Sequence, residues 1–115
     1  MNAYRHLLVA IDDTDEHQLL IKKALELTRR YQAKLSVLHV LDNIPMPDTP
    51  YGTRINLDEP SDYPLLEQEK RQLAELADAL KIKHNSCWLV WGSPNQEIVT
   101  LADQESVDLI ILGSH

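Results

Sequence analysis

The stretch "GSPNQEIVTLADQESVDLIILGSH", residues 92–115, contains a helix and a strand in succession, and this pairing decides the fold class. Ser93 can cap the helix, Pro94 suits its first position, and Gln96 completes a capping box. We expect this helix to run to about residue 105. Residues 107–112 are then apolar apart from Asp108, which predicts a buried strand.

Upstream of this stretch, further apolar runs alternate with amphipathic ones. Alternation of this kind predicts an α/β fold, a Rossmann-like sandwich around a parallel sheet with right-handed crossovers. We place the first and last strands centrally, because they are the most uniformly apolar. The third strand begins with polar residues and is expected nearer an edge. The predicted strands are 6–11, 33–40, 84–91 and 107–112, and the predicted helices are 16–31, 65–80 and 93–105.

The segment 42–64 differs from the rest of the chain. It holds five of the six prolines and shows no periodic apolar pattern. We predict a flexible proline-rich loop there, longer than most connections. The 115 residues otherwise fit a single domain, residues 1–115, without an internal repeat.

Charge and composition limit the classes of partner. The chain has 18 acidic and 11 basic residues, a net charge of −7, which disfavours nucleic acid and anionic membranes. The single cysteine, Cys87, excludes an internal disulfide and is expected to pack in a strand. Because no apolar run approaches ~18 residues and no signal segment is visible, we expect a cytoplasmic protein without a membrane span.

Ligands of open parallel sheets bind beyond the carboxyl ends of the strands, where the strand order reverses. Asp12 follows the first predicted strand and either contacts such a ligand or caps backbone amides. Gly92 opens the last helix, where an anion could bind, although a well-capped helix explains the same residues. The sequence shows no Ser-His-Asp order, no metal-ligand spacing and no complete phosphate-binding loop. We therefore expect no catalytic residue and no metal site.

The acidic pair Asp12-Asp13 leaves a remote alternative open. Response-regulator receiver domains carry such a pair, which binds magnesium beside a phosphorylated aspartate. A receiver also needs an aspartate at the end of its third strand. Asp58 has the approximate sequence position, but no apolar strand precedes it.

Three stretches together resemble the universal stress protein family: "YRHLLVAIDDTDE" (4–16), "AKLSVLHVLD" (33–42) and residues 92–115. The resemblance implies a homodimer with a five-stranded parallel sheet in each subunit. Four strands are visible here, so the resemblance implies that the fifth strand and last helix of the family are missing. We expect about 30 residues to follow His115, which makes 1–115 a C-terminally truncated domain.

The resemblance also implies a ligand and its site. Members of one group of the family bind ATP or AMP and at most hydrolyse ATP slowly, and their glycine-rich motif begins at the position of Gly113. The implied function is a stress-response sensor that binds an adenine nucleotide, with Mg²⁺ at the phosphates. The alternative is a stress protein without nucleotide, acting through dimerisation and protein contacts. By position, Asp12 matches the carboxylate that contacts adenine, and Val40 matches a residue at the base and sugar. Leu112 and Gly113 match the strand end that lies beside the ribose and phosphates. Ala10 and Ile11 match residues that line the pocket.

Overall fold

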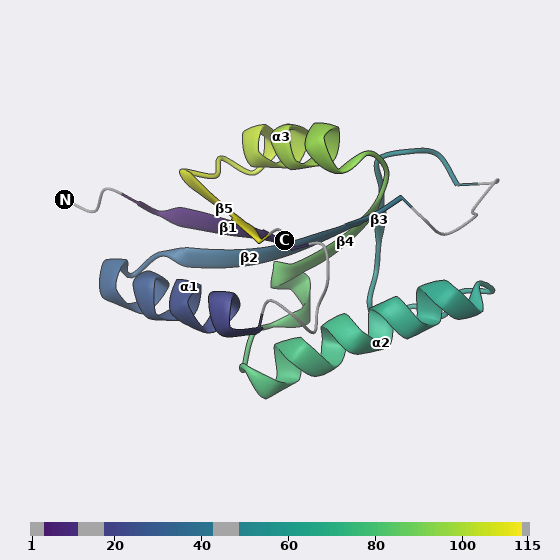
Figure 1. The fold of residues 1–115 in the computed structure, drawn as a ribbon, viewed down its shortest axis with the longest axis horizontal. Helices are drawn as coiled ribbons and strands as arrows, with labels where there is room; N and C mark the ends of the chain where they lie inside the picture. Colours follow the sequence, from purple (N-terminus) through teal and green to yellow (C-terminus); the bar gives the residue numbers. More distant parts are fainter. Residues whose placement is uncertain (1–3, 12–17, 43–48, 114–115) are drawn as a thin grey trace.

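The computed structural model describes residues 4–11, 18–42 and 49–113. Strands and helices alternate along most of the chain, as the apolar pattern predicts (Figure 1). The elements are β1 (His6–Ile11), α1 (Gln18–Tyr31), β2 (Lys34–Leu41), β3 (Thr53–Ile55), α2 (Pro64–Ala79), a 3₁₀ turn (His84–Ser86), β4 (Cys87–Trp91), α3 (Pro94–Gln104) and β5 (Leu109–Gly113).

One sheet holds the described molecule together, in the strand order β3-β4-β2-β1-β5. Neighbours pair in parallel throughout, except that β3 runs antiparallel to β4. Helices α1 and α2 lie on one face of the sheet and α3 lies on the other (Figure 1). The α/β fold class is therefore confirmed. None of the helices in the described ranges is long and apolar enough to cross a membrane.

Burial on both faces explains why β1 reads as an unbroken apolar run. Leu7 and Val9 belong to the core beneath α1 and α2, whereas Leu8 belongs to the core beneath α3. All three are completely buried. Each such side chain contributes roughly 1.5–3 kcal/mol to the free energy of unfolding.

The expected count of strands is wrong in one respect. A fifth strand is present in the described sheet, and it lies within the segment 42–64 that was predicted to be a loop. β3 is only three residues long and pairs through Thr53 with Trp91 at the end of β4. Gly52 precedes it at φ +92°, a conformation that favours glycine, and its amide donates to the Trp91 carbonyl. Residues 43–48 lie outside the described ranges.

The predicted positions of two strands are also corrected. β5 lies at an edge of the described sheet, while β4 lies inside, between β3 and β2. In β5, Ile110 is 38% exposed and Leu112 63% exposed. A short apolar run has the same sequence pattern in a central strand and in an edge strand. The prediction of a central position for β5, which rested on its uniformly apolar sequence, was therefore wrong.

All three α-helices end with a residue in the left-handed conformation that is not glycine. At each end a backbone amide donates to the carbonyl five residues earlier, as in a Schellman motif, for example from Val107 to Ala102. These bonds satisfy the last helical carbonyls, although a side chain in this conformation costs about 1–2 kcal/mol. The left-handed residues are Gln32 (φ 53°), Lys81 (φ 59°) and Ser106 (φ 54°).

Candidate functional site

A cavity of about 310 Å³ opens on the α3 side of the sheet, at the carboxyl ends of β1, β2 and β5. Its floor is apolar, because Leu38, Ala10 and Leu112 lie side by side on three adjacent strands. The first turns of α3 form the opposite wall. The full lining is Ala10, Ile11, Leu38, Val40, Pro94, Asn95, Ile98, Leu112 and Gly113.

The connections of the sheet place this cavity at the point where strand order reverses. The chain passes from β1 to β2 on one side, and after β4 it crosses to β5 on the other side of β1. The crossover helices α1 and α3 consequently cover opposite faces (Figure 1). In doubly wound folds this is the usual position of a ligand.

The N-terminus of α3 brings hydrogen-bond donors to one end of the cavity. Ser93 is the N-cap residue and Pro94 follows it, as predicted, but the Ser93 side chain forms no capping bond. The backbone amides of Asn95 and Gln96 donate to no described residue. These donors lie at the positive end of the helix dipole and can interact with the polar part of a ligand.

On its Gly92 side, the start of α3 that the sequence suggested as an anion site is occupied by a side chain of the protein itself. The side chain of Glu97, which is 8% exposed, packs against this glycine. A Cβ added to Gly92 would lie 2.8 Å from Glu97 Cγ, so any larger residue there would displace the Glu97 side chain. Glu97 also approaches Gly52, and thus packs the segment before β3 against α3.

The structure brings together every predicted binding residue that it describes. Ala10, Ile11, Val40, Leu112 and Gly113 all line the cavity. The sixth residue, Asp12, lies outside the described ranges.

Sequence reasoning missed Leu38, Pro94, Asn95 and Ile98 as members of the lining. Two signals could have found Leu38 and Ile98. Leu38 stands two residues before Val40 and therefore shares its face of the strand, and Ile98 is one helical turn beyond Pro94.

Asp58, on which the receiver hypothesis depends, lies at the other end of the sheet. Its Oδ1 is 3.0 Å from Nδ1 of His84, which precedes the amino end of β4. The cavity lies at the carboxyl ends, so Asp58 does not join the end of β1. The arrangement that a receiver needs is absent from the described residues.

Cys87 is a packing residue, as predicted. Its side chain is buried at the start of β4, and burial raises the pKa of the thiol to about 12. The thiol therefore stays protonated near neutral pH and is a poor nucleophile. Among the described residues, no group of three or more His, Cys, Asp or Glu side chains is placed to hold a metal ion.

Comparison with known sequences gives matches along nearly the whole chain. The family model described as "Universal stress protein family" matches residues 3–115. The chain is 31% identical over 113 residues to a universal stress protein A homolog of Haemophilus influenzae, covering 97% of this chain and 78% of the relative. It is also 31% identical over 116 residues to universal stress protein A homolog 2 of Coxiella burnetii, covering 100% of this chain and 78% of the relative.

Solved structures give a consistent result. A protein of the universal stress protein family from Burkholderia pseudomallei matches the fold with a TM-score of 0.58 at 22% identity, covering 100% of this chain and 85% of that one. Universal stress protein UspA from Lactobacillus plantarum matches with a TM-score of 0.56 at 27% identity, covering 97% and 78%. The first likeness concerns the fold alone.

Proposed function

The chain belongs to the universal stress protein family, and from this premise we propose that it binds an adenine nucleotide, ATP or AMP, in the cavity between β1, β2, β5 and α3. One observation carries the proposal. The residues that the family resemblance assigns to the nucleotide, so far as they are described, line a single cavity at the strand-order reversal.

The chemistry of the lining suits the parts of a nucleotide. The apolar floor at Ala10 and Leu38 offers a flat surface for a purine base. The free amides at the start of α3 and the backbone at Gly113 offer polar contacts to ribose and phosphates. A volume of about 310 Å³ is at the low end for ligand sites, which favours a nucleotide whose phosphates extend out of the cavity.

The same lining favours a sensor over an efficient enzyme. None of the residues that line the cavity in the described part of the chain is an acid, a base or a nucleophile. We expect at most slow ATP hydrolysis, with Mg²⁺ held mainly by the phosphates. The biological role that follows is a cytoplasmic, homodimeric stress regulator whose bound nucleotide favours one conformational state by differential affinity.

Calorimetric titration with ATP and with AMP, each with and without Mg²⁺, tests the proposal. We expect saturable binding that Asp12→Ala weakens about tenfold or more, because the charge-assisted hydrogen bond proposed between Asp12 and adenine would be lost. Asp42→Ala is the matched control, since Asp42 follows β2 in the same way but does not line the cavity. Absence of heat at millimolar nucleotide would overturn the proposal, and equal affinities of the two variants would remove Asp12 from the site.

The exposed edge of β5 favours a second candidate, a stress protein that acts through dimerisation without nucleotide. Ile110 and Leu112 present apolar side chains on this edge strand. Sedimentation of the wild type and of Ile110→Glu separates the candidates. Dissociation of a dimer by this substitution, together with no nucleotide binding, would favour the second one.

A further inference from the structure

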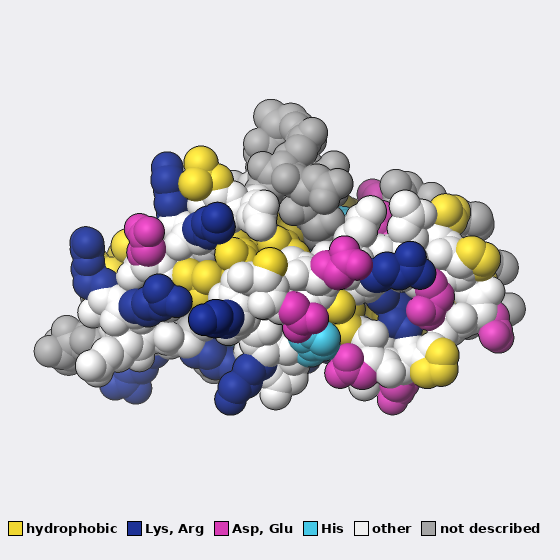
Figure 2. Space-filling view, turned by 90° about the horizontal axis from the view of Figure 1, so that it is seen from below, with side chains coloured by type: hydrophobic (Ala, Val, Ile, Leu, Met, Phe, Trp, Pro, Cys, Tyr) yellow, Lys and Arg dark blue, Asp and Glu magenta, His cyan; other side chains and the backbone are white. Residues whose placement is uncertain are grey.

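Charge is distributed unevenly over the face made by α1 and α2. Helix α1 carries four basic residues and one acidic residue, in a chain that has 11 basic and 18 acidic residues. Figure 2 shows lysine and arginine side chains gathered over one part of this face and acidic side chains over the other. An acidic protein therefore presents a locally basic surface, remote from the cavity on the α3 side.

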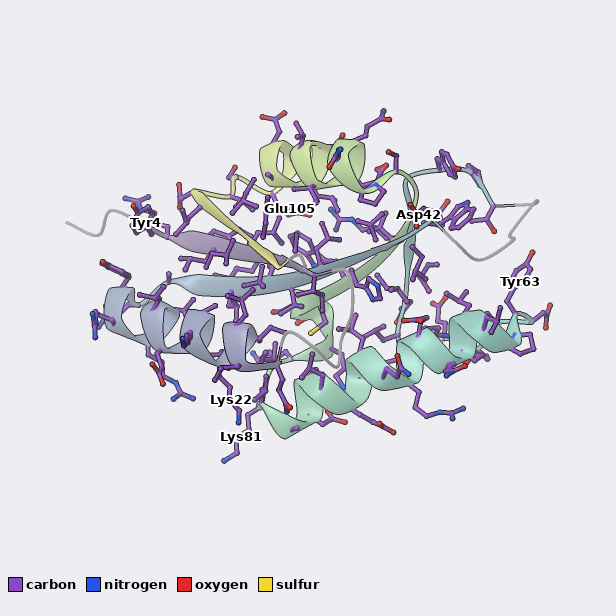
Figure 3. The ribbon with its side chains drawn as sticks, in the orientation of Figure 1. Tyr4, Lys22, Asp42, Tyr63, Lys81 and Glu105 are labelled. Atoms are coloured by element: carbon purple, nitrogen blue, oxygen red, sulfur yellow. The ribbon has the colours of Figure 1, made fainter. Side chains whose placement is uncertain are left out.

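A cleft of about 300 Å³ lies within this basic surface, between α1 and the end of α2. Lys22 lies on α1 and Lys81 follows the C-cap of α2, and Figure 3 shows them close together beneath the sheet. The cleft is lined by the cations Lys22, Arg29 and Lys81, the carboxylate Glu26, and the apolar side chains Leu25 and Leu80. We call this group the basic cleft.

The cations of the basic cleft have no partners among the described residues. Lys22, Arg29 and Lys81 form no side-chain hydrogen bond or ion pair there. Two cations outside the cleft do have carboxylate partners, Arg54 with Glu105 at 2.7 Å and Lys70 with Glu67 at 2.9 Å. Neighbouring unpaired cations repel one another, so an anionic partner would gain both attraction and relief of that repulsion.

We propose that the basic cleft binds an acidic segment of a partner protein. Carboxylates of the segment pair with Lys22, Arg29 and Lys81, while an apolar side chain packs on Leu25 and Leu80. Lys23 and Arg30, also exposed on α1, extend the positive potential beyond the cleft.

A short peptide segment fits this cleft better than an extended polyanion. The net charge of −7 repels nucleic acid or an anionic membrane along most of their length, whereas a short segment meets only the local field. The apolar floor also adds contacts that a bare phosphate cannot use. This surface is independent of the proposed nucleotide site, so either assignment can fail alone.

Fluorescence anisotropy tests the proposal with a fluorescein-labelled peptide of repeated Glu-Glu-Leu units and a matched Lys-Lys-Leu peptide. We expect the acidic peptide alone to bind the wild-type protein. Affinity should fall about tenfold between about 50 mM and about 300 mM salt, because exposed charges are screened. The triple variant Lys22→Glu, Arg29→Glu, Lys81→Glu should weaken binding about tenfold or more.

Arg71→Glu is the matched control, because Arg71 is exposed on α2 but does not line the basic cleft. It should leave peptide affinity within about twofold of wild type. Equal loss in this variant and the triple variant would overturn the proposal, as would equal binding of the two peptides. Tighter binding of single-stranded DNA or phosphatidylserine vesicles, abolished by the triple variant, would overturn the class of partner. Thermal melting of each variant checks that it is folded.

Discussion

Two regions of the molecule use their polar groups in opposite ways. In the cavity between β1, β2, β5 and α3, the walls are apolar and the first amides of α3 have no partner among the described residues. On the other face, the turn before α2 is held by hydrogen bonds that involve both backbone and side-chain groups, and we call the residues that form them the clasp. The clasp consists of Asp58, Glu59 and Ser61 in the turn, with Glu67, Lys70, Asp78 and His84 around them.

The clasp is built around two side chains. Lys70 is 3% exposed, and its Nζ donates to the Glu59 carbonyl and, at 2.9 Å, to Glu67 Oε1. His84 lies between two carboxylates, 3.0 Å from Asp58 and 2.8 Å from Asp78. In the clasp, therefore, polar groups are bonded to one another and stabilise the fold. In the cavity, amide donors without a partner among the described residues lie beside an apolar wall and are available to a ligand.

The largest effect is expected in the clasp. Lys70→Ala removes both hydrogen bonds and the packing of the lysine stem, and should lower the free energy of unfolding by about 2 kcal/mol. Urea unfolding measures this loss. The exposed neighbour Arg71 is the control, since Arg71→Ala should cost no more than about 0.5 kcal/mol. Equal losses would mean that Lys70 does not anchor the turn.

The next effect belongs to the cavity. Leu112→Glu places a carboxylate beside the nucleotide phosphates and should weaken ATP binding about tenfold. Leu112 is 63% exposed, so stability should change little. Ile110→Glu changes the same face of β5 outside the cavity and should leave affinity unchanged. Titration calorimetry measures the ATP affinity of both variants. Equal weakening of ATP binding in both would mean that the loss comes from a charge on the edge strand β5 and not from the cavity.

The pH dependence of stability is a smaller effect and should come from the clasp. Hydrogen bonds to Asp58 and then Asp78 raise the pKa of His84 above its usual 6.5. A raised pKa in the folded state contributes stability that is fully present below 6.5 and is lost as pH rises through the folded-state pKa. The urea midpoint of the wild type should therefore fall between about pH 6 and about pH 8. His84→Gln should flatten this slope, and an identical slope in the variant would exclude His84 as its source.

The smallest effect concerns the end of α3. Ser106→Gly relieves the left-handed conformation and should raise the free energy of unfolding by about 0.5 kcal/mol, after the greater freedom of glycine in the unfolded chain is counted. Ser106→Ala keeps the strain and should bring no gain. ATP affinity should be the same in both Ser106 variants. This result would show that the stability of the end of α3 does not affect the part of α3 in binding. A gain in melting temperature from alanine as well would contradict the explanation.

More of the cavity than of the clasp could be predicted from the sequence. Val40 and Leu112 were found because a binding position at a strand end follows from the alternation of strands and from the family resemblance. Leu38 shares a strand face with Val40, but its place in the floor also depends on its register beside Ala10, which the sequence does not show. His84 and Asp58 are 26 residues apart and meet only after folding, so no local pattern shows their contact.

Strands that are recognised by their burial were predicted well, whereas features that depend on pairing between strands were predicted poorly. β1 and β2 have long apolar runs that match the buried strands. β3 has three residues, and its pairing with β4 left no periodic signal in a proline-rich segment. The edge position of β5 could not be told from four consecutive apolar residues.

The most direct test of the account follows backbone amides by NMR while ATP is added. The account predicts shifts of the Ala10, Ile11, Val40 and Gly113 amides, which saturate together, and of the Asn95 amide at the start of α3. Amides of the clasp should stay where they are. Shifts confined to the clasp, or no shifts at millimolar ATP, would contradict the assignment of the cavity as the nucleotide site.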